Sequence, residues 1–171
     1  MNNKEKKYRL LRQLFLIVVI FSIALSLANY DDYIGLLESR NEVIFSINEV
    51  THSLNDEKIE VSILFSILNP TSYSRLKFSS LQSQLYLIVD GNEEFMGTTG
   101  YSPPFDVPLP PEEIITYTTK LSISKNNIFS LTEGVIDDEL EWRIRNVVHF
   151  STPIKRFYQN FNTTQTSRLQ N

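Results

Sequence analysis

The chain has 171 residues and a net charge of −4, and it contains no cysteine. The length allows one domain and an additional segment, and the lack of cysteine excludes disulfides, thiolate zinc sites and cysteine nucleophiles. Because five of the 16 basic residues but only one of the 20 acidic residues lie in the first twelve positions, the remainder carries a net charge of about −8, which excludes the basic surface that nucleic-acid binding requires.

The first element is a basic N-terminus followed by an apolar run. Residues 14–28, LFLIVVIFSIALSLA, contain no polar residue other than serine. As a helix, this run is about 22 Å long, and the flanking Arg12 and Tyr30 extend it toward the interfaces of a bilayer core of about 30 Å. The pattern predicts a transmembrane signal-anchor helix over residues 13–30, behind a cytoplasmic N-terminus of residues 1–12.

Two alternatives to a retained anchor stay open. Ser26-Leu27-Ala28 has small residues at the positions that a signal peptidase recognises, so the chain could be secreted after cleavage following Ala28. The apolar run could also form a buried helix of a soluble protein. Whether the apolar run is a retained anchor or a cleaved signal peptide, the basic residues before it and Asp31-Asp32 after it predict a cytoplasmic N-terminus and an extracytoplasmic body.

After a connector at residues 31–41, apolar residues alternate with polar ones, which is typical of strands with one buried face. About seven strands are expected within residues 42–158, and this number favours an antiparallel β-sandwich. The polar residues 159–171 predict a flexible tail. The alternating stretches are 43–47, 59–67, 85–89, 115–123 and 140–150, with a short return strand at 94–97.

The long strand at residues 59–68 ends in Asn69-Pro70. Proline lacks a backbone N–H and is excluded from central strands, so the strand must stop there. The side chain of Asn69 is expected to bond backbone groups of the following turn. Further along, residues 90–92 (DGN) predict a hairpin turn, and residues 126–134 predict one or two helical turns.

The order of these elements resembles the type 2 late embryogenesis abundant family, also called the water stress and hypersensitive response (WHy) domain. The likeness rests on a strand ending in Asn69-Pro70, followed by LQSQLYLIVDG, VPLPPEE, ITYTTKLSI, a short helix and LEWRIRNVVHFSTPI, and it covers about residues 42–158. It implies an immunoglobulin/fibronectin-III-like sandwich with Asn69 and Pro70 as a fold motif, and a protective role during water loss. Ile154-Lys155 departs from the family, which often has glycine there.

Few residues could carry chemistry. His52 and His149 lack partners at metal-ligand spacing, and no serine nucleophile arrangement accompanies them. Asp137, Asp138 and Glu139 could bind calcium through oxygen ligands, although they lack the spacing of a dedicated loop. We therefore expect no catalytic residue, no metal site, no cofactor and no enzymatic activity.

Several side chains could contact partners instead. Tyr101 and Phe105 lie in a proline-rich stretch that fits either a recognition tip or a rigid crossover. Arg143 and Arg145 share a solvent face and could meet an acidic partner. Asn162 begins a glycosylation sequon.

These features predict a single-pass, membrane-anchored, extracytoplasmic and non-catalytic protein with a stress-protective role. Its expected partner is the lipid bilayer through residues 13–30, together with envelope proteins or the membrane surface. The alternative is a structural, assembly or docking subunit of a cell-envelope complex, with Leu64 and Leu68 as an apolar edge. A weaker alternative is a glycan-binding accessory domain, for which Trp142, otherwise a core anchor, or Tyr101 would be the platform.

Overall fold

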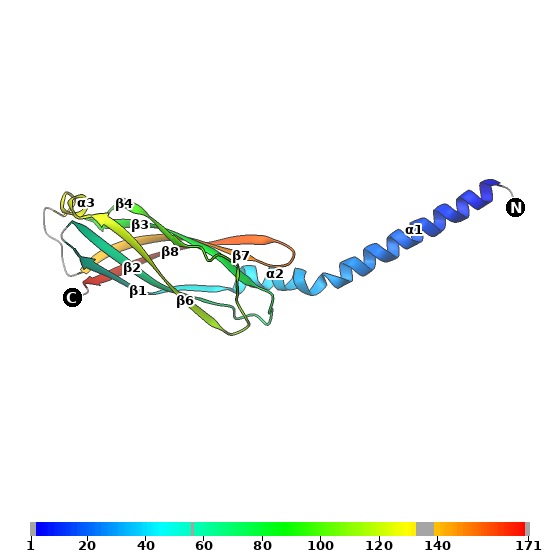
Figure 1. Cartoon of the computed structure of the whole chain (residues 1–171), viewed down its shortest axis with the longest axis horizontal. Helices are drawn as coiled ribbons and strands as arrows, with labels where there is room; N and C mark the ends of the chain where they lie inside the picture. Colours follow the sequence, from blue (N-terminus) through cyan, green and yellow to red (C-terminus); the bar gives the residue numbers. More distant parts are fainter. Residues whose placement is uncertain (1–2, 56, 133–138, 170–171) are drawn as a thin grey trace.

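The computed structural model describes residues 3–55, 57–132 and 139–169. A long helix projects from one end of an elongated β-sheet body, and strand β8 ends at the opposite end of that body (Figure 1). The elements in chain order are α1 (Asn3–Ala28), α2 (Tyr30–Glu42), β1 (Ile44–Leu54), β2 (Lys58–Leu68), β3 (Lys77–Val89), β4 (Asn92–Tyr101), β5 (Val107–Pro108), β6 (Ile114–Ser124), α3 (Lys125–Phe129), β7 (Glu139–Ser151) and β8 (Arg156–Leu169).

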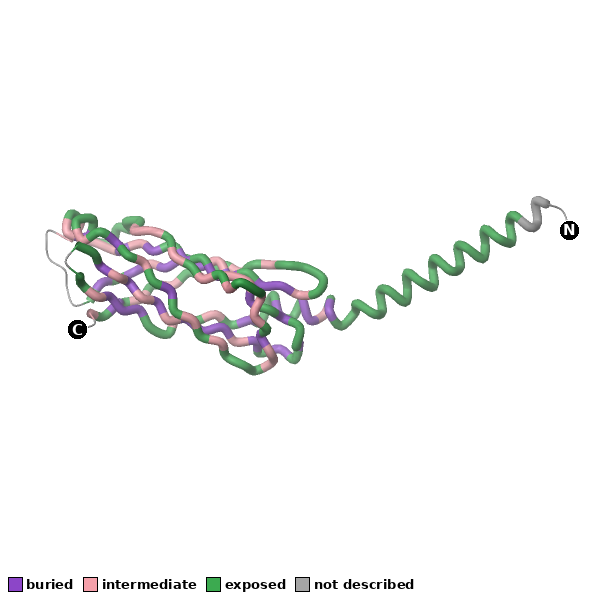
Figure 2. Tube along the Cα trace, viewed as in Figure 1, coloured by how far each residue is buried: buried purple, intermediate pink, exposed green. Residues whose placement is uncertain are grey.

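Helix α1 is exposed along its whole apolar part (Figure 2). Lys7–Ala28 forms a 22-residue stretch that is long and apolar enough to cross a membrane. The hydroxyls of Ser22 and Ser26 donate to carbonyls one turn earlier in the helix, so they are satisfied without water. Such a helix is typical of membrane anchors and of signal sequences. Its exposure contradicts the alternative of a helix buried in this body.

The strands form one sheet in the order β4-β3-β7-β8-β1-β2-β6, and β5 lies beside β3. Neighbouring strands are antiparallel except β1 and β8, which pair in parallel through two residue pairs that include Thr51 and Arg168. The sheet curls until its two outer strands meet. There, the Thr99 hydroxyl on β4 donates to the Lys120 carbonyl on β6 at 2.7 Å.

The mostly β body is confirmed, but its architecture differs from the expected antiparallel immunoglobulin/fibronectin-III-like sandwich of about seven strands. The described residues form a single curled, 8-stranded sheet of mixed pairing. The difference arises from β8, which lies between β7 and β1 where we expected a flexible tail over residues 159–171. Its inward positions hold Phe157, Phe161 and, at the end of the strand, Leu169, but the inward positions between them are polar, so its alternation is weak in the sequence. Its order comes from hydrogen bonding to β7 along its full length.

Two helical segments also differ in extent from the expectation. The connector at residues 31–41 is part of helix α2, whose buried side anchors it to the sheet. Helix α3 begins at Lys125, one residue before the helical stretch expected at residues 126–134, and ends within that stretch at Phe129. Gly134, the last residue of that expected stretch, lies outside the described residues, as do Asp137 and Asp138, two of the three calcium candidates.

The interior is divided into two hydrophobic clusters along the long axis of the body. Between them, the buried Ser83 hydroxyl donates to the Asn146 side chain at 2.7 Å, so both polar groups are satisfied inside the sheet. The cluster far from α1 contains Val50, Ile59, Val61, Ile63, Leu85, Leu87, Ile123, Ile128, Leu140, Trp142 and Ile144. The cluster next to α2 contains Val43, Phe65, Ile67, Tyr73, Leu76, Phe78, Leu81, Leu109, Val148 and Phe150.

Candidate functional site at the junction of helix and sheet

The turn after β2 is built on Asn69, whose side chain is fully buried. Its amide nitrogen donates to the carbonyls of Tyr73 at 2.9 Å and Leu109 at 3.0 Å. Its amide oxygen accepts from the backbone N–H of Thr71 at 3.1 Å and from the Thr71 hydroxyl at 2.7 Å. The expected bonding of Asn69 to the following turn is therefore present. It also reaches across to the strand-linking segment at Leu109, which the sequence did not indicate.

This turn holds Tyr73 and Arg75 against the first turn of α2. The Tyr73 hydroxyl donates to Asp32 Oδ1 at 2.9 Å, and Arg75 donates to Asp32 Oδ2 at 2.7 Å. Asp32 is 4% exposed, so its charge is removed from water and compensated at both oxygens. Burial, followed by the hydrogen bond to Asp32, raises the pKa of Tyr73 to about 12, so Tyr73 remains a donor at neutral pH.

Helix α2 approaches the Tyr73 ring so closely that only glycine fits at position 35. A Cβ atom on Gly35 would lie 2.1 Å from Tyr73 Cδ2. At the other end of α2, the Gln159 side chain on β8 donates to the Arg40 carbonyl. The helix is therefore held to the sheet by contacts near both of its ends.

Helices α1 and α2 are joined without a flexible linker. The backbone N–H of Asn29 bonds the Leu25 carbonyl at 3.3 Å, and the N–H of Tyr33 bonds the Asn29 carbonyl at 3.0 Å. The Asn29 side chain also donates to the Leu25 carbonyl, at 2.8 Å. Because helical hydrogen bonding continues across the boundary, the docking of α2 sets the direction in which α1 leaves the body (Figure 1).

The structure does not bring the four predicted interaction residues into one surface. Tyr101 is half-buried and stacks on Tyr117 with ring centroids 4.3 Å apart, so it belongs to the interior of the curled sheet. Phe105, 83% exposed, lies in the loop between β4 and β5. Arg143 and Arg145 lie on the outer face of β7.

The two arginines are already paired within the body. Arg145 donates to the Glu93 carboxylate on β4 at 2.7 Å, and its guanidinium lies 4.4 Å from the centre of the Tyr86 ring. Arg143 lies 3.7 Å from the same carboxylate. An acidic partner would have to compete with Glu93 for these two side chains. The arginines are therefore a weaker docking site than we expected from their solvent-facing positions in the strand.

Trp142 is the core anchor, and its complete burial excludes the alternative of a surface platform. Its indole N–H donates to the Ser167 hydroxyl at 2.8 Å, and Nδ1 of the buried His52 lies 2.8 Å from the same oxygen. Sequence reasoning missed this cluster because Ser167 fell in the expected tail. His149 is exposed on β7, with its ring 6.0 Å from the Tyr158 ring.

Asn162, the sequon residue, is exposed on the outer face of β8 and lies opposite Arg145 in the β7–β8 ladder. A strand is a more constrained setting than the mobile tail we expected, because the backbone on one side is already hydrogen-bonded to β7. Glycosylation at this position stays a prediction.

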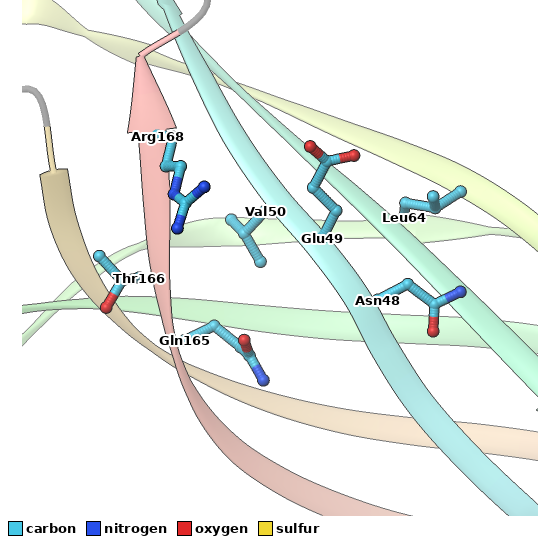
Figure 3. A pocket seen from close by; sticks show the side chains of 7 residues that line it. All are labelled: Asn48, Glu49, Val50, Leu64, Gln165, Thr166 and Arg168. Atoms are coloured by element: carbon cyan, nitrogen blue, oxygen red, sulfur yellow. The ribbon is translucent and has the colours of Figure 1, made fainter.

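A depression of about 420 Å³ lies on the surface where β1 and β8 separate (Figure 3). A β-bulge between Ile47 and Glu49 bends β1 away at this point, so the strands pair only beyond it. Leu64, one of the two predicted edge residues, lines the depression together with Glu49 and Arg168. The depression therefore combines an apolar side chain with charges of both signs.

Comparisons with solved structures show which fold this is. The body is similar to the solution structure of a protein from Arabidopsis thaliana, with 16% identity, coverage of 73% of this chain and 80% of that one, and a TM-score of 0.51. The chain is also similar to the solution structure of a putative late embryogenesis abundant (LEA) protein, with 14% identity, coverage of 90% of this chain and 87% of that one, and a TM-score of 0.50. No family model matches the chain, and no curated protein does. The chain therefore has an LEA-like fold.

Proposed function

We propose that this protein is a single-pass membrane protein whose helix α1 anchors a non-catalytic, extracytoplasmic β body in a fixed orientation. The proposal rests on the contrast between the two helices. Helix α1 is exposed over Lys7–Ala28, whereas α2, which continues it, is locked to the sheet through Asp32, Tyr73 and Gly35. Among the described residues, the apolar side chains of Lys7–Ala28 are not buried against the body, so they require another apolar environment, and the lipid bilayer provides it.

Retention of the helix is favoured by the junction. Cleavage after Ala28 would break a helical segment whose hydrogen bonds run from Leu25 to Tyr33. It would remove the Leu25 carbonyl, which accepts from both the backbone N–H and the side chain of Asn29, the residue that precedes α2. We therefore favour an anchor over the cleaved, secreted form.

Membrane extraction and mass measurement test this proposal. The protein, purified from its own membranes, should remain in the lipid fraction after alkaline carbonate treatment, and its mass should include residues 1–28. Protease added outside intact cells or spheroplasts should digest the body and spare the basic N-terminus. A soluble product that begins at Asn29 would replace the anchor by the secreted form, and the opposite protease pattern would reverse the topology.

For the role of the anchored body, we propose protection of the membrane during water loss. The support is the LEA-like fold together with the fixed attachment of that fold beside the bilayer. Vesicles carrying the full chain should retain an entrapped dye after drying and rehydration better than vesicles with a synthetic peptide of residues 1–42. Equal leakage from the two preparations would refute the protective role without affecting the anchor.

A second candidate function is that of a docking subunit in a cell-envelope complex. It is favoured by the strand edge of β8, which pairs with β7 from Arg156 to Arg168 but with β1 only from Arg168 onward. An edge of this kind can accept a strand from another chain. Gentle detergent extraction should then yield a fixed stoichiometric complex, whereas the protective role predicts the protein without a companion.

A further inference from the structure

We propose that the turn between β7 and β8, residues 152–155, is a second membrane contact that places Ile154 in the bilayer interface beside helix α1. This inference rests on the proposed anchor and adds to it a lipid-binding surface on the β body. The partner is a phospholipid surface. The body would then be attached to the membrane at two points, the helix and the turn.

The position of the turn along the molecule carries the inference. A depression of about 510 Å³ lies between helix and turn, and it is lined by Ser26, Asn29, Tyr30, Tyr33, Pro153 and Ile154. Ser26 belongs to the last turn of α1, so Ile154 lies at the level where the apolar stretch Lys7–Ala28 ends. Figure 1 shows the β7–β8 hairpin reaching the point where α1 leaves the body.

The side chains around this depression suit the interface of a bilayer. Ile154 is 43% exposed at the tip of a turn, and Tyr30 and Tyr33 are 59% and 54% exposed on the helix. Tyrosine, with an apolar ring and a polar hydroxyl, is enriched at the boundary between hydrocarbon and water. Lys155 and Arg156 follow directly and are exposed, so their charged ends can reach lipid headgroups.

The turn is rigid enough to hold this position. The backbone N–H of Thr152 donates to the Lys155 carbonyl at 3.0 Å, and the Thr152 hydroxyl donates to the same carbonyl at 2.9 Å. The Lys155 N–H donates to the Thr152 hydroxyl oxygen at 3.2 Å. Beside the turn, Ser151 donates to Asp106 at 2.7 Å. Since α2 is also fixed to the sheet, helix and turn approach the same plane together.

A lipid surface is favoured over a protein partner because the exposed apolar side chains of the turn continue those of α1. The opposite end of the body offers a control. There, the depression between the β1–β2 turn and α3 is lined by Glu57, Lys58, Lys125 and Asn126, among others, and Leu54 is 38% exposed. Leu54 therefore matches Ile154 in exposure and in its place beside a turn, but not in its proximity to α1.

Single-cysteine labelling tests the contact, because the natural chain has no cysteine. Ile154→Cys and Leu54→Cys variants of the full chain would each carry a fluorescent label in vesicles of phosphatidylcholine with a minority of phosphatidylglycerol. Co-flotation with the vesicles is checked first, and its failure would refute the anchor itself. Nitroxide attached to the upper acyl chain of the lipid should then quench the label at 154 severalfold more than the label at 54, while aqueous iodide shows the reverse order.

Equal quenching of the two labels in floating vesicles would overturn the inference and leave the anchor intact. The label at 154 could also be shielded from iodide without being quenched by the nitroxide, to an extent that depends on the ratio of protein to lipid. That result would overturn the inference and assign the turn to a contact between copies of this chain. Both positions are exposed, so neither substitution threatens folding. An Ile154→Glu variant, labelled at Tyr158→Cys, should show weaker lipid quenching than the same label beside the natural isoleucine.

Discussion

Replacing Asp32 by alanine should weaken the docking of α2 on the sheet. The loss of docking free energy can be worked out from the two contacts that Asp32 makes. The change leaves the Tyr73 hydroxyl, on a residue 9% exposed, without its acceptor, which costs about 1–3 kcal/mol. The pair with Arg75 adds about 0.5–1 kcal/mol, because the arginine side chain is 60% exposed. The two effects amount to about 1.5–4 kcal/mol of docking free energy.

Hydrogen exchange followed by mass spectrometry can measure this loss locally. Peptides from α2 should exchange about 13 to 900 times faster in the Asp32→Ala variant, since each 1.36 kcal/mol is a factor of ten. Peptides from β7 should be nearly unchanged, because the core around Trp142 is not altered. Asp31→Ala is the matched control: Asp31 is the exposed neighbour, so its replacement should change α2 exchange little.

Two results would refute this reasoning. If Asp31→Ala and Asp32→Ala accelerated α2 exchange equally, the effect would come from helix charge and not from the buried carboxylate. If Tyr73→Phe added its full cost on top of Asp32→Ala, the two groups would not be energetically coupled. A double-mutant cycle should instead show that the second substitution costs much less once the first is present.

Three further predictions use the same structure. Gly35→Ala should speed the exchange of α2, because the overlap of its Cβ with the Tyr73 ring outweighs the gain of about 1 kcal/mol in helix propensity; slower exchange would show that the ring moves aside. Ser167→Ala should lower the free energy of unfolding by about 1–3 kcal/mol, since it leaves the buried indole N–H of Trp142 without an acceptor. Urea unfolding followed by the fluorescence of Trp142, the single tryptophan, measures this loss. An unchanged midpoint would instead support the flexible tail that we expected over residues 159–171. Raising the pH from 10 to 12 should weaken α2 docking, because folding raises the pKa of Tyr73 from 10.0 to about 12. The stabilisation from Tyr73 is fully present below pH 10 and is lost as the pH rises through 12. Urea midpoints measured across this range should fall less for a Tyr73→Phe variant, which lacks the ionising hydroxyl.

The sequence by itself determined the features that depend on local pattern. The apolar run became helix α1 because its composition permits nothing else over that length. The alternation at residues 59–67 became β2 for the same reason, and Asn69-Pro70 ended it because proline cannot donate to a ladder. The burial of Trp142 followed from its place in an alternating strand.

Tertiary structure alone decided where these elements meet. Asp32 reads in the sequence as half of a charged pair behind the apolar run, and only the folded chain brings it to Tyr73, 41 positions later. Strand β8 is ordered by its pairing with β7 and not by its own weak alternation, so the mixed, curled sheet could not be foreseen. Contacts between distant residues depend on how the chain returns on itself, and local periodicity contains no information about that return.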